Sequence, residues 1–379
     1  MGITRTGAEY NDMRRISIAK PSIGTEEIEA VTRVLESGQL AQGETVYQFE
    51  REFSEHFGYT GSAAVANGTA ALHVALLAAG VKPGDKVLTT PFTFVATSNA
   101  ILYCNAVPVF VDVDEASFNI SPEAIRKAAN DFPEARYLLL VHLFGQSCEM
   151  DKIVEIANEF NLTIIEDCAQ AHGATYQSKP VGTFGCSGTF SFYPTKNMST
   201  GEGGMIVSKD TQFLDTSKLL INHGSKQRYV HEILGYNYRM TNIAATIGIE
   251  QLKKIDQMNS ARRKNADYYF SNIHNNLVTL PFVHKYSHHV FHQFTITTTY
   301  RDQLVSYLTE KGIGTGIHYQ LPVHKQLHIK EYLASVKQKQ YSCPTAEKLS
   351  EQVLSIPVNP ALSMEDLEYV AQTINKFSV

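Results

Sequence analysis

Residues 137–172 read YLLLVHLFGQSCEMDKIVEIANEFNLTIIEDCAQAH, and they place a helical stretch between two short apolar runs. The runs, 137–141 and 162–166, are mainly apolar rather than alternating. This pattern is typical of parallel strands that are covered on both faces. The same reasoning predicts further strands at 63–66, 86–90, 108–112, 188–192 and 204–208. We therefore expect an α/β fold, in which a large domain has a mostly parallel seven-stranded sheet with helices on both faces.

The rest of the chain extends this pattern and then departs from it. Helical spacing of apolar residues predicts helices at 25–37, 44–57 and 69–79. After about residue 240 the pattern indicates a long helix from 241 to about 272, a strand at 291–298, and helices at 301–311, 345–353 and 364–376. We expect three parts: an N-terminal arm (1–20), a large domain (21–255) and a smaller C-terminal α+β domain (256–379).

Composition narrows the class of protein. The 379 residues carry 33 Lys+Arg and 38 Asp+Glu, which gives a net charge of 33 − 38 = −5 and argues against a nucleic-acid partner. No apolar run approaches the ~20 residues of a membrane span, and the first residues lack the apolar stretch of a signal peptide. The five cysteines are scattered, with no C-x-x-C pair. These observations lead us to expect a cytoplasmic protein that does not bind membranes.

Three polar segments follow predicted strands, at the edge where open α/β sheets bind ligands. In the first, Asn67-Gly-Thr69 separates the strand 63–66 from the next helix. A glycine lets the backbone approach a ligand closely, and a helix N-terminus attracts an anion. The segment is therefore either a phosphate site or a plain turn in which Thr69 caps the helix.

The other two segments contribute an acid and an amine. Asp167 follows the apolar run 162–166, where a carboxylate is costly unless it meets a cation or caps a turn. Lys196 follows a short strand and a proline turn. It is either an exposed loop lysine or a desolvated amine able to form a Schiff base. A phosphate site, a strand-end carboxylate and a Schiff-base lysine together are what pyridoxal 5′-phosphate (PLP) requires.

Six segments, in order, resemble one enzyme family. They are 66–72 (ANGTAAL), 91–94 (PFTF), 166–173 (EDCAQAHG), 191–197 (SFYPTKN), 201–204 (GEGG) and 235–240 (GYNYRM). From about residue 17 to its end, the chain resembles the PLP-dependent nucleotide-sugar aminotransferases, or DegT family, of aspartate-aminotransferase fold type I. The resemblance implies ping-pong transfer of an amino group from L-glutamate to a nucleotide-linked 3- or 4-keto-deoxysugar, with pyridoxamine phosphate between the two halves. It also implies amino-sugar biosynthesis for surface glycans or related products.

The resemblance implies roles for the residues around the cofactor ring. Lys196 forms the Schiff base and then moves a proton between the substrate carbon and the cofactor. Asp167 pairs with the ring nitrogen. Gln170 reaches the phenolic oxygen, and Phe94 stacks on the ring face.

The cofactor phosphate is assigned by the same resemblance. Gly68, Thr69 and Ser191 hold it, and Asn237 reaches it from the neighbouring subunit, so that a homodimer shares its active sites. Judged from the residues alone, Asn237 is a turn residue. Arg239 is a candidate contact for the substrate diphosphate.

The predicted small domain is rich in histidine. Residues 316–324 resemble a family segment that approaches the sugar, which makes His318, Tyr319 and His324 candidate substrate contacts; surface and packing roles are the alternative. We expect no metal site there. A strand over 287–298 would point His288 and His289 to opposite faces, and no cysteine or paired carboxylate accompanies them.

Two other functions stay open at this stage. One is a PLP enzyme acting on an amino acid or another small keto substrate. Such enzymes usually carry a small-domain arginine that forks a carboxylate, and Arg301, at a predicted helix start, is the only arginine after residue 264. The other is a non-catalytic ligand sensor, which we would expect to have lost Lys196 or Asp167. Lys196 also favours amino transfer over dehydration, because related sugar dehydratases carry histidine at that position.

Overall fold

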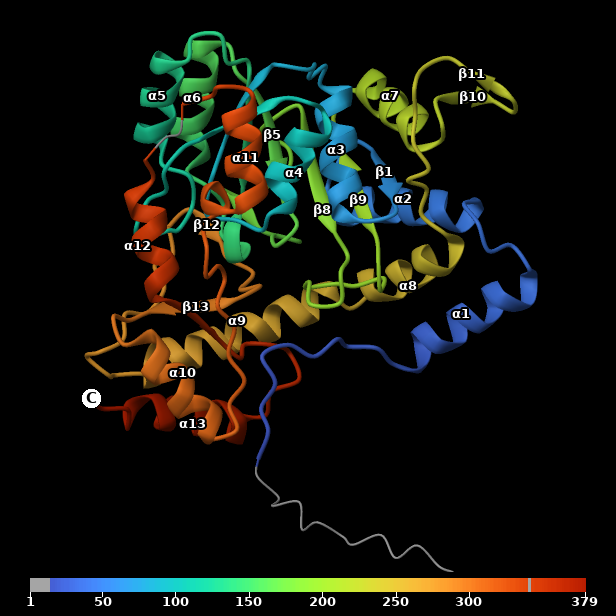
Figure 1. Cartoon of the computed structure of the whole chain (residues 1–379). Coiled ribbons are helices and arrows are strands. Elements are labelled where there is room, and N and C mark those ends of the chain that lie inside the picture. The colour runs from blue at the N-terminus through green and yellow to red at the C-terminus, as the bar shows by residue number, and fades with distance from the viewer. Residues whose placement is uncertain (1–13, 340–341) are drawn as a thin grey trace, which may run out of the picture.

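A seven-stranded sheet forms the centre of the protein, as the computed structural model of residues 14–339 and 342–379 shows (Figure 1). Its strand order is β1-β9-β8-β5-β4-β2-β3. The strands are β1 (Ser62–Val65), β2 (Lys86–Thr89), β3 (Val107–Phe110), β4 (Tyr137–Val141), β5 (Thr163–Asp167), β8 (Ser187–Ser191) and β9 (Gly204–Val207). Strand β9 pairs antiparallel with β8 and β1, whereas the other pairs are parallel. The prediction of a mostly parallel sheet is therefore confirmed.

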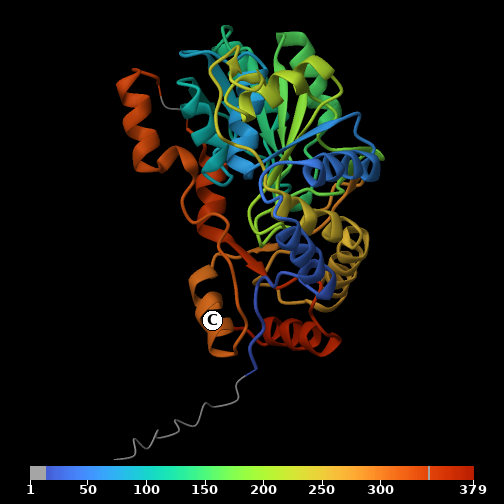
Figure 2. The same cartoon turned by 90° about the vertical axis from the view of Figure 1, so that its right-hand side faces the viewer.

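Helices cover both faces of this sheet (Figure 2). On one face lie α3 (Gly68–Ala78), α4 (Ala96–Tyr103) and α7 (Thr211–Ile221). On the other lie α2 (Glu44–Phe57), α5 (Pro122–Asp131), α6 (Met150–Phe160) and α8 (Asn242–Leu252). Along β4, Leu139 packs with the first group, while Leu138 and Leu140 pack with the second. Successive side chains of a strand alternate between faces, so burial of both faces requires an unbroken apolar run.

The C-terminal part of the chain has a core of its own. Strands β13 (Phe294–Thr297) and β14 (Val353–Ile356) pair antiparallel. They share a hydrophobic cluster with α9 (Ile255–Asn272), α10 (Arg301–Glu310) and α13 (Met364–Asn375). Two further helices, α11 (Leu327–Ser335) and α12 (Pro344–Gln352), pack against the end of the large sheet. None of the helices in the described ranges has both the length and the apolar character that a membrane crossing requires.

The N-terminal region packs against distant parts of the chain. Helix α1 (Thr25–Ser37) lies against α8, and Ile16 forms a bridge with Ile313. Of the arm expected over residues 1–20, residues 1–13 lie outside the described residues.

Several element boundaries differ from those expected. The helix expected over 241–272 is two helices, because the chain turns at Lys254, whose ammonium group contacts the Glu26 and Glu27 carboxylates near α1's start. The strand expected over 287–298 is interrupted, because residues 290–293 bond to the backbone of Phe144 and Gly145 instead of continuing a sheet. The helix expected to reach residue 353 ends one residue earlier, where β14 begins.

Candidate active site

The N-terminus of α3 and the end of β8 form one corner of the site. The Asn67 side chain caps α3 by accepting a hydrogen bond from the N–H group of Ala70 (2.9 Å). The backbone N–H groups of Gly68 and Thr69 make no hydrogen bond to the described part of the chain. A Cβ atom on residue 68 would lie 2.6 Å from the Cβ atom of Ser191, so only glycine fits this close approach. Two free N–H groups at a helix N-terminus, beside a serine hydroxyl, suit a phosphate group.

Asp167 lies at the carboxyl end of β5, and its side chain is buried. Its Oδ2 atom accepts a hydrogen bond from the Thr97 hydroxyl (2.9 Å), and its Oδ1 atom accepts one from the N–H group of Ala169 (3.1 Å). Burial raises the pKa of this carboxyl group, while the two hydrogen bonds and the positive charge of Lys196 oppose the rise. The carboxylate makes no ion pair with any described residue, so it can accept a protonated ring nitrogen.

Lys196 follows β8 in a turn whose backbone is closed by a hydrogen bond from its N–H group to the carbonyl of Tyr193 (2.9 Å). The side chain is partly buried. Burial lowers the pKa of its amine from 10.5 to about 8, although the negative charge of Asp167 acts in the opposite direction. An amine with this pKa is partly unprotonated near neutral pH, as a nucleophile or a general base must be.

Gln170, Tyr319 and Phe94 form the opposite wall. The Gln170 Oε1 atom accepts a hydrogen bond from the N–H group of Phe144 (2.7 Å), and its Nε2 atom donates one to the Tyr319 hydroxyl (2.9 Å). The ring of Tyr319 lies 6.3 Å from that of Phe94, between centroids. Because Phe94 is 57% exposed, a face of its ring is free to meet a planar ligand.

A buried polar network holds the turn that carries Lys196. The side-chain amide of Asn197 donates hydrogen bonds to Asn259 Oδ1 (2.8 Å) and to the Val290 carbonyl (3.0 Å). Its oxygen lies 3.2 Å from Nδ1 of His292, whose pKa burial lowers well below its usual value. His292 is therefore neutral, and the network anchors the lysine turn to α9.

Next to Asp167, Glu166 locks the end of β5 from the opposite face of the sheet. This buried carboxylate accepts hydrogen bonds from the N–H groups of Gly182, Phe184 and Gly185, all at 2.7 Å. His142 Nε2 lies 3.0 Å away, while His142 Nδ1 accepts from the N–H group of Cys148 (3.0 Å). His142, Glu166 and Cys168 lie close enough to share a metal ion. Their hydrogen bonds already occupy the Glu166 oxygens and both imidazole nitrogens, which explains the cluster without a metal.

The structure places His318 near this site but His324 away from it. His318 Nδ1 bonds to the Ser355 hydroxyl (2.9 Å), and burial, followed by the charge of Lys196, lowers the pKa of its imidazole to about 4. His324 is buried against the Phe110 ring, and its Nε2 atom lies 3.0 Å from a Glu347 oxygen. No hydrogen bond or ring contact within the described ranges joins His324 to the residues around Lys196, so its geometry favours a packing role.

The two candidates from the 235–240 segment point to different surroundings. Asn237 is exposed, and its backbone bridges to Asn222. Arg239 donates a hydrogen bond from Nη1 to the Asn222 side chain (2.5 Å), so its guanidinium is engaged within its own chain. The segment pairs with the end of strand β1, because Val65 bridges to Arg239 and the N–H group of Ala66 bonds to the carbonyl of Tyr238 (2.7 Å).

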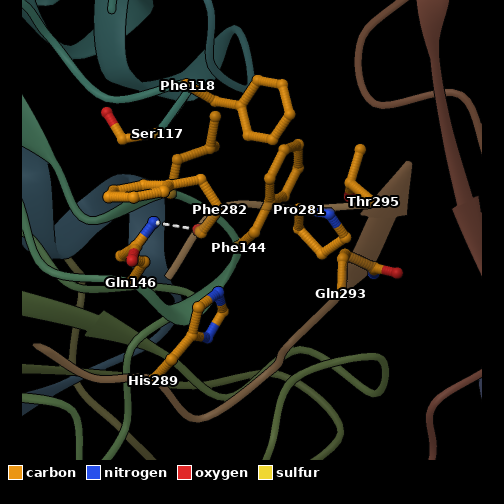
Figure 3. Close-up of a pocket in the computed structure, with 10 residues that line it drawn as sticks. Ser117, Phe118, Phe144, Gln146, Pro281, Phe282, His289, Gln293 and Thr295 are labelled. Atoms are coloured by element: carbon orange, nitrogen blue, oxygen red, sulfur yellow. Dashed lines mark hydrogen bonds between the residues drawn. The ribbon is translucent and has the colours of Figure 1, made fainter. Parts of the chain in front are cut away.

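A small cavity lies between Phe144 and the segment 281–295 (Figure 3). Aromatic and polar side chains line it, including Phe118, Gln146 and Phe282. Its volume is about 10 Å³, which is near the space that a single water molecule needs. This cavity is therefore too small to receive a substrate.

The sequence reasoning missed Thr97, which contacts Asp167 directly. The matched segment 91–94 stops three residues before it, and a lone threonine carries no signal of its own. The only available indication was its position three residues after Phe94.

Comparisons with known proteins agree with this geometry. Residues 21–375 match the model of the DegT/DnrJ/EryC1/StrS aminotransferase family. The chain is 39% identical to the GDP-perosamine synthase of Escherichia coli O157:H7, over 96% of this chain and 99% of that protein. It is 38% identical to a pleiotropic regulatory protein of Geobacillus stearothermophilus, over 94% and 95% of the two chains. The crystal structure of S. venezuelae DesV in complex with a ketimine intermediate is similar, with a TM-score of 0.87, 35% identity, and coverage of 93% of this chain and 94% of that one. The chain therefore belongs to the DegT/DnrJ/EryC1/StrS aminotransferase family.

Proposed function

We propose that this protein is a PLP-dependent aminotransferase that moves an amino group from L-glutamate to a keto-sugar linked to a nucleoside diphosphate. One observation carries the proposal. Three groups meet at one edge of the sheet: a lysine amine with a pKa of about 8, a buried carboxylate, and a helix N-terminus. Among the residues that the structure describes, the carboxylate has no ion-pair partner and two N–H groups of the helix are free. When bound, PLP supplies an electron sink and a carrier for the amino group.

The residues of this chain divide the work around that cofactor. The Asp167 carboxylate would accept a hydrogen bond from the ring nitrogen of PLP and favour its protonated form. The Lys196 amine would hold the cofactor, and its unprotonated form would be the base that takes the proton from the substrate carbon. The Gln170 amide has its oxygen fixed by Phe144 and one N–H fixed by Tyr319. Its second N–H group is free to donate to the ring's phenolic oxygen.

The phosphate and the ring faces are held by other groups. We assign the phosphate to Gly68, Thr69 and Ser191, because their free N–H and hydroxyl groups lie together. We assign one ring face to Phe94, whose side chain is open to a ligand.

We further propose a homodimer with shared sites, in which Asn237 reaches the phosphate of the partner subunit. Asn237 is exposed, and so is the nearby hairpin of β10 (Ser225–Gln227) and β11 (Val230–His231). Tyr229 and Leu234 in this region are 81% and 83% exposed. Large apolar side chains that lie exposed together on one surface are typical of a protein–protein contact.

The domain boundary and the cellular location complete the proposal. We place the boundary between a large and a small domain near residue 255, because α8 ends at Leu252 and the cluster around β13 and β14 is separate from the sheet's own. We place the reaction in the cytoplasm, which the five unpaired cysteines favour.

The structure favours a sugar over an amino-acid-derived keto acceptor. Arg301 donates a hydrogen bond to the Ser350 carbonyl (3.0 Å) and pairs with Asp302, so its guanidinium is not free to fork a substrate carboxylate. The regulatory name of one relative raises a sensor role as the second candidate. A sensor would bind a ligand without turnover, which separates the two functions.

The test is a panel of nucleoside diphosphate keto-sugars that differ in the base and in the position of the keto group. Each is incubated with the PLP-loaded protein and ¹⁵N-labelled L-glutamate, and the products are analysed by mass spectrometry. We expect at least one ¹⁵N-labelled amino sugar, and none with the Lys196→Ala variant. Absence of labelled product across the whole panel, with 2-oxo acids aminated instead, would support the amino-acid alternative.

A further inference from the structure

Two buried threonine hydroxyls stand in line behind Asp167. The Thr97 hydroxyl lies 2.9 Å from Asp167 Oδ2, and the Thr93 hydroxyl lies 3.0 Å from that of Thr97. Both threonines are almost fully buried, with exposures of 3% for Thr93 and 1% for Thr97. Neither residue belongs to the set assigned above to the cofactor.

The direction of these hydrogen bonds follows from the chemistry of the groups. An ionised carboxylate only accepts hydrogen bonds, so Thr97 must donate its single hydroxyl hydrogen to Asp167. The oxygen of Thr97 then accepts the hydrogen of Thr93. The chain of donors therefore runs from Thr93 through Thr97 to Asp167, and each bond strengthens the next.

Asp167 needs these donors because its position opposes its charge. Burial raises the pKa of the carboxyl group, and the Thr97 hydroxyl and the N–H group of Ala169 are the hydrogen bonds that oppose the rise. Thr97 is the only side chain in the described ranges that donates a hydrogen bond to this carboxylate. The Thr97 hydroxyl therefore both stabilises the ionised form of Asp167 and orients its carboxylate toward the position of a protonated ring nitrogen.

The same turn also carries the stacking residue. Thr93 and Thr97 flank Phe94, and the N–H group of Thr97 bonds to the Phe94 carbonyl (3.2 Å). Displacement of Thr97 would therefore disturb the ring nitrogen and the ring face together.

Building on the proposed function, we propose that Thr97, oriented by Thr93, is a positioning residue that keeps Asp167 ionised and aimed at the cofactor's ring nitrogen. Thr97 itself touches neither substrate nor cofactor in this scheme. It acts through the carboxylate alone.

The experiment compares four variants, first without the cofactor and then with PLP bound. Thr97→Val removes the donor and keeps the shape, Thr97→Ser restores the donor, and Thr93→Val removes only the second hydroxyl. Thr89→Val is the matched control. Thr89 is equally buried and donates a hydrogen bond to the Leu139 carbonyl (2.8 Å), with no contact to Asp167.

The first measurement is the affinity of each cofactor-free variant for PLP. We expect a loss of roughly 10- to 100-fold for Thr97→Val, the range of one hydrogen bond to a charged group. Thr93→Val should lose less, and Thr97→Ser and Thr89→Val should bind as the wild type does. The second is the pH midpoint of the bound cofactor's visible band. It should rise in Thr97→Val, because a ring nitrogen that is less protonated repels the proton on the lysine-linked nitrogen less.

The outcomes distinguish a failure of the proposed role of Thr97 from a failure of the proposed PLP-dependent function. A wild-type protein that takes up no PLP would overturn both. A wild type that binds PLP, with Thr97→Val indistinguishable from Thr89→Val in affinity and midpoint, would overturn the role of Thr97 alone. If Thr97→Val does not fold, as judged by circular dichroism, Thr93→Val replaces it in the comparison. A loss of PLP affinity of less than about tenfold, but greater than that of Thr89→Val, would support the role of Thr97. An affinity equal to that of Thr89→Val would overturn it.

Discussion

The lowered pKa of Lys196 predicts a large excess of free amine at this one residue. Burial sets its pKa at about 8 rather than 10.5. At about pH 7.5, a group with a pKa of about 8 is roughly a quarter unprotonated, whereas one at about 10.5 is unprotonated in roughly one molecule in a thousand. Lys196 should therefore present about 200-fold more free amine than an ordinary lysine. Because deprotonation rises with pH, its reactivity should be half-maximal at about pH 8 and reach a plateau roughly one pH unit or more above that.

Competitive labelling measures this directly and without the cofactor. The cofactor-free protein is treated with a trace of an acylating reagent across a pH series, and each lysine is quantified by peptide mass spectrometry. Lys152 is an internal reference whose pKa shifts in the opposite direction, because its hydrogen bond to the Glu149 carboxylate raises its pKa. In Asp167→Asn the Lys196 midpoint should fall further, since the Asp167 charge raises it. A Lys196 midpoint at or above that of Lys152 would refute the reasoning.

Three further predictions follow from the same site. Gly68→Ala should weaken PLP binding about tenfold or more, measured by titration of the cofactor-free protein, because the added Cβ would lie 2.6 Å from that of Ser191; unchanged affinity would place the phosphate elsewhere. Glu166→Gln should lower the free energy of unfolding by about 3 kcal/mol or more in urea denaturation, because an amide N–H₂ group would face buried donors; a change within 0.5 kcal/mol, the scatter of surface substitutions, would contradict the lock. Mixing inactive Asn237→Ala and Lys196→Ala proteins should restore about a quarter of wild-type activity, because each hybrid dimer regains one intact site; no recovery would mean that Asn237 serves its own subunit.

Local pattern was enough to predict the sheet. In β4 the residues Leu138, Leu139 and Leu140 meet a core on one face or the other, as do Ile164 and Ile165 in β5, and the polar residue that ends β5 is visible as Asp167. The break between α8 and α9 was not predictable in this way. It is associated with the contact of Lys254 with Glu26, which lies 228 positions away in the sequence.

The residues of the site also differ in whether local sequence or a contact with a distant residue determines their role. Asp167 stands out because a charged residue directly after a buried strand is unusual. Lys196 resembles an ordinary loop lysine by itself and stands out through the segment 191–197 that contains it. Thr97 does not stand out, because its contact with Asp167 spans 70 positions and its residue type is common in helices and loops alike. His324 shows the converse, because the segment that contains it matched a family pattern while its ring is buried beside Glu347.

The most direct test of the central claim is the visible absorbance of the PLP-loaded protein, first with L-glutamate and then with a nucleotide-linked keto-sugar. The account predicts a yellow band that fades on addition of glutamate, with one 2-oxoglutarate released per active site, and that returns when the sugar is added. A protein that stays colourless after incubation with PLP, or a band that glutamate leaves unchanged, would contradict it.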